Sequence, residues 1–231
     1  MRIVVFGAAG STGRVLVGQA LAAGHQVVAA ARRPERVQPR AGLTVVQAEV
    51  GDADAVSTAV AGSDAVISVV GGTPSRKPVS VYSTAARSII GAMHERGVKR
   101  LLVVSSVILE PGWRPSNAFF FNNVLDPLVN RVMARTTHDD MRRMERLVRD
   151  SGLDWTIVRP SGLFDNHAPT AYEVQEDQAD GLFTAREDLA ASMLAQVDRD
   201  AFVRRAMAVI TTQVRPNIAK LIWREAIMAK K

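Results

Sequence analysis

The sequence contains no cysteine, and this absence removes several kinds of chemistry. Disulfide bonds, thiolate nucleophiles and cysteine-ligated metals are excluded. The four histidines are scattered without the spacing of a zinc site, so no metal site is expected. No run of about 18 uninterrupted apolar residues occurs, which excludes a typical transmembrane helix. The start of the chain passes from Met1-Arg2 directly into an apolar run without a small-residue cleavage motif. We therefore expect a soluble, cytoplasmic protein.

The length and composition favour one domain. The chain has 231 residues, and 47% of them are hydrophobic, which is enough to bury one sizeable core. We predict a single domain over residues 1–231, present as a monomer or a homodimer.

The formal net charge of +6 is unevenly distributed along the chain. Eight basic residues stand against three acidic ones between about residues 197 and 231, so most of the excess lies in this basic C-terminal tail. Two interpretations remain open, a solvated face or a docking surface for an acidic partner or a membrane. With the charge concentrated at one end, no nucleic-acid partner is expected.

Strand and helix patterns alternate along most of the chain. Apolar runs predict strands at 2–6, 26–31, 43–47, 65–70, 101–105 and 156–158. Helical patterns lie between them at 14–23, 53–61, 81–96 and 139–151, and Gly24, Gly97 and Gly152 follow three of these as stop residues. This alternation predicts an α/β fold, a Rossmann-type doubly wound parallel sheet with right-handed crossovers.

One segment interrupts the alternation, at about residues 108–137. It contains three prolines and the aromatic triplet Phe119, Phe120 and Phe121. It leaves the carboxyl end of a predicted strand, which is where ligands bind in doubly wound sheets. We interpret it as an insertion whose phenylalanines contact a substrate, although packing of the triplet against the core remains an equal alternative.

Glycines follow the first predicted strand at positions 7, 10 and 13 and precede a predicted helix. In this context the first glycine permits a tight turn, the second lets the backbone approach a pyrophosphate, and the third allows close packing of helix on strand. Backbone N–H groups and the positive end of the helix would hold the phosphates. The predicted cradle consists of Gly7, Ala9, Gly10, Ser11, Thr12 and Gly13.

About 20 residues beyond the glycines, the position that selects between NAD and NADP reads Ala31-Arg32-Arg33. A carboxylate there would bind the ribose 2′-hydroxyl of NAD, and none is present. Arginine instead offers a planar fork to a phosphate. Arg32 and Arg33 therefore predict a preference for NADPH, unless they merely start a solvated turn before Pro34.

Four separated motifs together resemble one known family. The glycine spacing, residues 103–106 (VVSS), residues 151–163 (SGLDWTIVRPSGL) and residues 184–190 (TAREDLA) are similar to motifs of the atypical short-chain dehydrogenase/reductases. The resemblance is strongest to the NmrA-like proteins and the flavin reductase/biliverdin reductase B branch, and it covers about residues 1–195. It implies a nicotinamide-dinucleotide-binding domain.

The resemblance also implies roles for further residues. Ser106 would be the active-site serine near the nicotinamide, with Ser105 beside the cofactor. Glu49 and Val50 would lie where the family binds adenine. Two other segments would contact the cofactor: Val70, Gly71 and Gly72 beneath it, and Pro160, Ser161 and Gly162 along the nicotinamide face.

The sequence departs from the family at its catalytic pair. Where related reductases have Tyr-x-x-x-Lys, the matching positions are Asp139 and Arg143, and only Arg143 retains a cation that could bind the cofactor. An arginine does not deprotonate, and a carboxyl group with a pKa near 4 is a poor acid at neutral pH.

An acceptor that needs little proton catalysis therefore fits best, such as a flavin, a quinone or a tetrapyrrole-like molecule. We predict an NADPH-dependent reductase for which FMN or FAD would be a substrate rather than a prosthetic group. The alternative is an NmrA-like redox sensor that binds NADP(H) without turnover.

Overall fold

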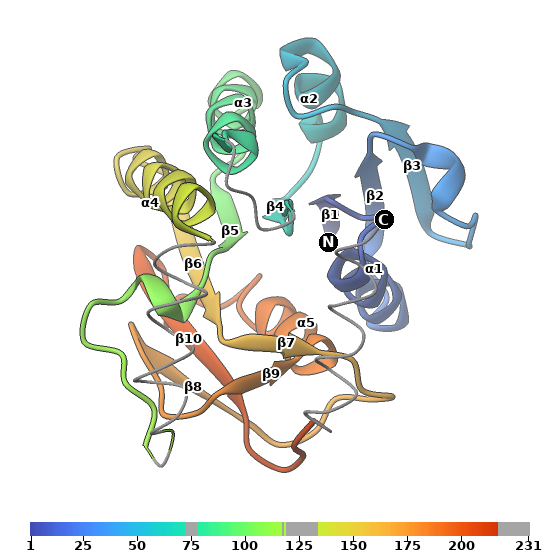
Figure 1. Ribbon diagram of the computed structural model, residues 1–231. Helices are drawn as coiled ribbons and strands as arrows, with labels where there is room; N and C mark the ends of the chain where they lie inside the picture. Colours follow the sequence, from blue (N-terminus) through green and yellow to red (C-terminus); the bar gives the residue numbers. More distant parts are fainter. Residues whose placement is uncertain (73–77, 117, 119–133, 217–231) are drawn as a thin grey trace.

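The computed structural model describes residues 1–72, 78–116, 118 and 134–216. It shows a single α/β domain in three layers, with a central sheet between two layers of helices (Figure 1). The sheet order is β3-β2-β1-β4-β5-β6-β10-β8, whose first six strands follow the order typical of dinucleotide-binding folds. The predicted fold class is confirmed.

Seven strands of the sheet run parallel. They are β1 (Arg2–Phe6), β2 (Gln26–Ala31), β3 (Leu43–Gln47), β4 (Ala65–Ser68), β5 (Arg100–Val104), β6 (Asp154–Pro160) and β10 (Arg205–Thr211). The eighth strand, β8 (Tyr172–Glu176), pairs antiparallel with β10 at the edge and so differs from the expected all-parallel sheet. β7 (Gly162–Phe164) and β9 (Phe183–Ala185) form a separate two-stranded sheet.

Five α-helices cover the two faces of the sheet. α2 (Ala53–Val60), α3 (Val81–Arg96) and α4 (Arg135–Arg149) lie on one face, and α1 (Ser11–Ala22) packs with α5 (Arg186–Leu194) on the other (Figure 1). Two short 3-10 helices, η1 (Pro34–Arg36) and η2 (Val107–Leu109), follow β2 and β5. None of the helices in these ranges is both long and apolar enough to span a membrane.

The hydrophobic core is divided by the sheet into two halves. Val4 and Phe6 of β1 point toward the α2, α3 and α4 side, while Ile3 and Val5 point toward α1 and α5. All four side chains have no exposed surface. Successive side chains of a strand alternate between its faces, so a strand covered on both sides must be apolar at every position.

Two predicted regions overlap with regular elements. Arg205–Thr211, inside the expected basic tail, forms the inner strand β10, and its residues from Ala206 onward are buried. Of the expected insertion, residues 108–116 and 118 leave β5 by way of η2, and residues 135–137 already belong to α4. Phe119, Phe120 and Phe121 lie outside the described residues.

Candidate dinucleotide-binding site

A cavity of about 310 Å³ opens at the carboxyl ends of β1, β2, β3 and β4. Nine residues predicted from the sequence line it: Gly7, Ala9, Gly10, Arg32, Arg33, Glu49, Val50, Val70 and Gly71. Seven further lining residues were not predicted: Phe6, Ala30, Ala31, Arg36, Ala48, Val69 and Val81. The structure thus brings together residues that are up to about 70 positions apart in the sequence.

The turn between β1 and α1 depends on its glycines. Gly7 has a φ of +84°, and a Cβ atom on it would lie 2.8 Å from the carbonyl oxygen of Val69. A Cβ atom on Gly13 would collide with the carbonyl oxygen of Gly7, so this glycine allows helix and strand to approach closely. Gly10 closes the turn by donating its N–H to Gly7 O at 3.0 Å.

The N-terminus of α1 fits a phosphate group. Gly10 is the N-cap residue, no side chain caps the helix, and its first turn contains no acidic residue. The first N–H groups of a helix carry a partial positive charge, and here no carboxylate neutralises it. Ser11 is exposed and Thr12 half-buried, while Arg14, which the sequence analysis did not single out, donates to Ala9 O at 2.6 Å.

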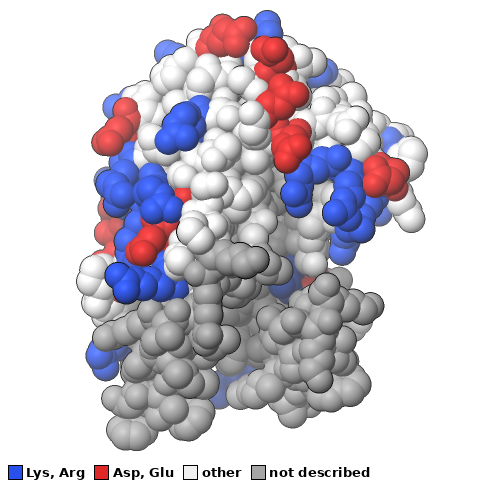
Figure 2. Space-filling view, turned by 45° about the horizontal axis from the view of Figure 1, so that its top comes forward, with Lys and Arg blue, Asp and Glu red and all other residues white. Residues whose placement is uncertain are grey.

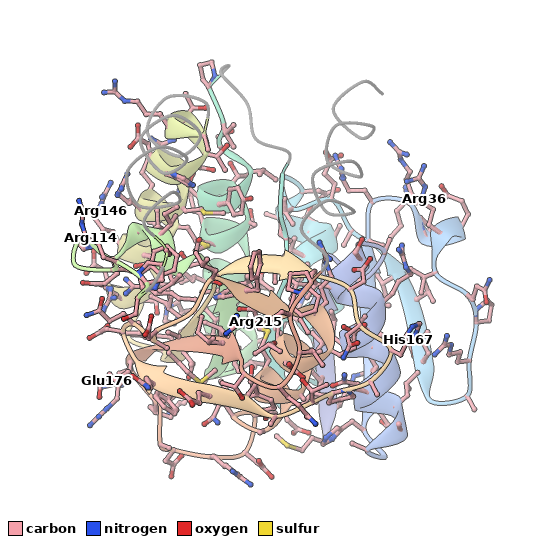
Figure 3. The ribbon with its side chains drawn as sticks, turned by 60° about the horizontal axis from the view of Figure 1, so that its bottom comes forward. Arg36, Arg114, Arg146, His167, Glu176 and Arg215 are labelled. Carbon is pink, nitrogen blue, oxygen red and sulfur yellow. The ribbon has the colours of Figure 1, made fainter. Side chains whose placement is uncertain are left out.

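Three arginines line the opposite part of the cavity. Arg32 and Arg33 follow β2, and Arg36 lies at the end of η1, from which it extends at the edge of the molecule (Figure 3). All three are exposed, and none forms a salt bridge with another described residue. Arg36 could have been found from its spacing, because residues i and i+3 eclipse in a 3-10 helix and Arg33 stands three positions earlier.

Other predicted residues stand beyond this cavity, at the ends of the next two strands. Ser105 and Ser106 follow β5, whereas Ser161 follows β6, which ends at Pro160. Parallel neighbours are about 4.8 Å apart, so β5 lies three spacings, or roughly 14 Å, from β2. An extended dinucleotide anchored near Arg32 would reach this region.

The two serines after β5 have different environments. Ser105 is buried, and its hydroxyl donates to Glu145 Oε1 at 2.7 Å. Ser106 is half-buried at the start of η2, and its hydroxyl has no hydrogen-bond partner among the described residues. Only the second hydroxyl is therefore free to bind a ligand.

The turn after β6 contains a second unpartnered hydroxyl. Ser161 donates its backbone N–H to Thr184 Oγ1 at 3.0 Å, but its own buried Oγ has no partner in the described part of the chain. Gly162 is needed next to it, because a Cβ atom there would lie 2.9 Å from Leu182 O. Such a hydroxyl is suited to bind a polar group of a ligand.

The positions that match the Tyr-x-x-x-Lys pair point elsewhere. Asp139 forms ion pairs along α4 with Arg142 at 3.1 Å and Arg135 at 3.9 Å. Arg143 donates to Val79 O at 2.9 Å and pairs with Asp140 at 3.2 Å. Neither lines the cavity.

The family model for NAD(P)H-binding proteins matches residues 7–200. The chain belongs to the NAD(P)H-binding family. This membership confirms the resemblance inferred from the sequence motifs and agrees with the glycine turn and the cavity.

Among relatives, a (4-alkanoyl-5-oxo-2,5-dihydrofuran-3-yl)methyl phosphate reductase of Streptomyces griseus is 33% identical over 165 residues. That alignment covers 71% of this chain and 49% of the relative, so the chain matches about half of that protein's length.

Two solved structures share the fold. ChuY, an anaerobilin reductase from Escherichia coli O157:H7, has a TM-score of 0.73 at 23% identity over 94% of this chain and 100% of its own. A short-chain dehydrogenase/reductase from Veillonella parvula in complex with NADP has a TM-score of 0.70 at 20% identity, covering 94% and 98%.

Proposed function

We propose that the protein is an NADPH-dependent reductase that delivers hydride to a planar conjugated acceptor such as a flavin, a quinone or a tetrapyrrole. The observation that carries this proposal is the cavity, which has an uncapped helix N-terminus in one wall and three unpaired arginines in another. These features suit the pyrophosphate and the 2′-phosphate of NADPH. A bound NADPH supplies the hydride.

The residues around the cavity would mainly bind and orient. The glycine turn fixes the phosphates, and Ser106 and Ser161 offer hydroxyls at the ends of β5 and β6. Holding donor and acceptor in near-attack geometry can lower a barrier by about 7–11 kcal/mol without an acid. With no Tyr-Lys pair at positions 139 and 143, this contribution supports an acceptor that needs little proton transfer.

The named relatives support a conjugated acceptor. The Streptomyces relative is a reductase of a ring that carries an oxo and an alkanoyl group, and ChuY is an anaerobilin reductase. A second candidate function is a redox sensor that binds NADP(H) without turnover, and the outward-facing Asp139 favours it.

Activity assays with the purified full chain separate these functions. The chain is incubated with NADPH and, in turn, FMN, dichlorophenolindophenol, menadione or biliverdin, and nicotinamide absorbance is followed while calorimetry reports binding. We expect oxidation of NADPH with at least one acceptor. NADPH binding without turnover would favour the sensor, and no binding would overturn the dinucleotide proposal.

Gly10→Asp is the matched control for these assays. Gly10 is the N-cap of α1 in an extended conformation, and aspartate is a favoured N-cap residue, so the helix should still form. The new carboxylate would stand where the pyrophosphate binds and repel it. The variant should remain folded and lose NADPH binding.

Replacing Ser106 with Ala tests its role with the acceptor. If the hydroxyl donates one hydrogen bond to developing negative charge, kcat should fall by about 10- to 100-fold with little change in KM. Ser57→Ala on α2, remote from the cavity, serves as the control. An unchanged kcat in Ser106→Ala would remove this residue from the mechanism.

A further inference from the structure

The first turn of α3 is capped by a residue from α4. Asp140 has no exposed surface, and its carboxylate accepts hydrogen bonds from the backbone N–H groups of Tyr82 at 2.9 Å and Ser83 at 3.4 Å. It also accepts one from the Ser83 hydroxyl. The helix's own N-cap residue, Ser80, makes no side-chain hydrogen bond to it. Asp140 therefore satisfies N–H groups that a helix N-terminus leaves unpaired, and its charge favours that end of the helix.

Arg143 strengthens this attachment one turn farther along α4. Its guanidinium pairs with Asp140 at 3.2 Å and donates to the carbonyl oxygen of Val79 at 2.9 Å, just before α3 begins. Two side chains of α4 thus hold the start of α3.

The start of α3 in turn holds the segment under the cavity. The Tyr82 hydroxyl accepts a hydrogen bond from Gly72 N at 3.1 Å, and a Cβ atom on Gly71 would lie 3.7 Å from the same oxygen. Gly71 and Val81 both line the cavity. Gly71 and Gly72 are exposed and have no side chains to anchor them, so this hydrogen bond to Tyr82 is their one side-chain anchor among the described residues.

The hydroxyl of Tyr82 stays protonated at neutral pH. Burial raises the pKa of Tyr82 above its ordinary value of 10.0, the Gly72 N–H lowers it, and the charge of Asp140 raises it further. The phenol oxygen thus accepts from Gly72 as a neutral group. The tyrosine ring itself is packed in the core, with 5% of the residue exposed.

We propose that Tyr82 is a positioning residue of the dinucleotide cavity, which fixes the Gly71-Gly72 peptide through its hydroxyl and is itself held by Asp140 and Arg143. The inference rests on the proposed function in that it takes the cavity to hold a dinucleotide. It also gives Arg143 a use, since the position that matches the family's lysine supports the cavity floor through α3.

Tyr82→Phe tests the proposal because it removes only the hydroxyl and keeps the ring. Loss of one hydrogen bond should raise the Kd for NADPH about 5- to 10-fold in calorimetry. The floor lies away from the arginines, so the Kd for NADH should rise by the same factor. Tyr172→Phe is the matched control, because Tyr172 is the only other tyrosine in the chain and lies on β8. It should leave both Kd values unchanged.

A purely structural role would give a different pattern, a lower Tm with unchanged Kd values. Asp140→Asn keeps the shape of the side chain and should raise the NADPH Kd while also lowering the Tm. Wild-type affinity in Tyr82→Phe would overturn the proposal.

A measurement without ligand separates this inference from the proposed function. Amide hydrogen exchange at Gly72 should be faster in Tyr82→Phe than in the wild type and in Tyr172→Phe. If no variant and no wild type binds NADPH, the proposed function fails, while faster exchange would still establish the anchor. Unchanged exchange at Gly72 would overturn the anchor itself.

Discussion

At the scale of single residues, the arginines after β2 carry the choice of cofactor. Arg32, Arg33 and Arg36 all line one cavity, and no described carboxylate pairs with them. An unpaired guanidinium keeps its full charge and its fork of donors for a phosphate. Glu49 lines the same cavity but follows β3, away from the position where an acidic residue would select NAD.

Replacing Arg32 and Arg33 together with Ala should weaken NADPH binding by at least about tenfold, because each charged hydrogen bond contributes about 1.5–3 kcal/mol. NADH lacks the 2′-phosphate and should bind nearly as before. Calorimetry with both cofactors measures the two effects, and Arg40→Ala on the neighbouring loop is the control. Equal losses for NADPH and NADH would show that these arginines support the fold or the adenine region instead.

At the scale of elements, a buried ion-pair network joins four segments near the end of β5. Arg159 of β6 is 4% exposed and pairs with Glu145 of α4 and with Glu110 after η2, each at 2.7 Å. Burial alone would lower the pKa of Arg159, but the hydrogen bonds and charges of Glu145 and Glu110 raise it. Ser105 donates to Glu145 as well, so the network fixes the strand end from which Ser106 extends.

Arg159→Met should lower the free energy of unfolding by about 3–5 kcal/mol, because it leaves Glu145 buried without its partner. Urea denaturation at neutral pH measures the loss. Arg205→Met is the matched control, since Arg205 pairs with Glu176 at the same distance of 2.7 Å but both side chains are about half exposed. That exposed pair should contribute less than about 1 kcal/mol. Similar losses in the two variants would contradict the role given to burial.

At the scale of the whole molecule, positive charge is distributed over separate areas. On the face shown in Figure 2, Lys and Arg side chains gather in two groups with uncharged surface and acidic side chains between them. The sequence placed most of the excess in residues 197–231, but β10 within that range is an inner strand. The net charge of +6 is therefore no guide to one continuous binding face on the part of the surface that is shown.

A single domain with one cofactor site should unfold in one transition that depends on the cofactor. NADPH at about 100 times its Kd should stabilise the native state by about 2.7 kcal/mol, and the Tm should rise by roughly 5–11 °C for a domain of this size. Thermal unfolding followed by circular dichroism, with and without NADPH, measures the shift. Gly10→Asp should show none. A shift that persists in this variant would place NADPH outside the glycine turn.

The amino-acid sequence by itself determined the parallel core of the fold. Continuous apolar runs such as Ile3–Phe6 and glycines at helix ends predicted β1 to β6 and α1 to α4 within a few residues, because both patterns are local. The nine predicted lining residues follow directly from strand ends. The sequence alone missed β8 and α5, since β8 is a half-exposed edge strand and α5 has acidic residues, Glu187 and Asp188, that are buried only by tertiary partners.

Only the tertiary structure decided which side chains stand free and which are engaged. Ser105 and Ser106 are neighbours in sequence, yet one hydroxyl is held by Glu145, 40 residues away, and the other is not. Asp139 and Asp140 differ in the same way, because adjacent residues on a helix point about 100° apart and only the second faces α3. The hydrogen bond from Gly72 to Tyr82 depends on the packing of α3 and α4 and has no local pattern that predicts it.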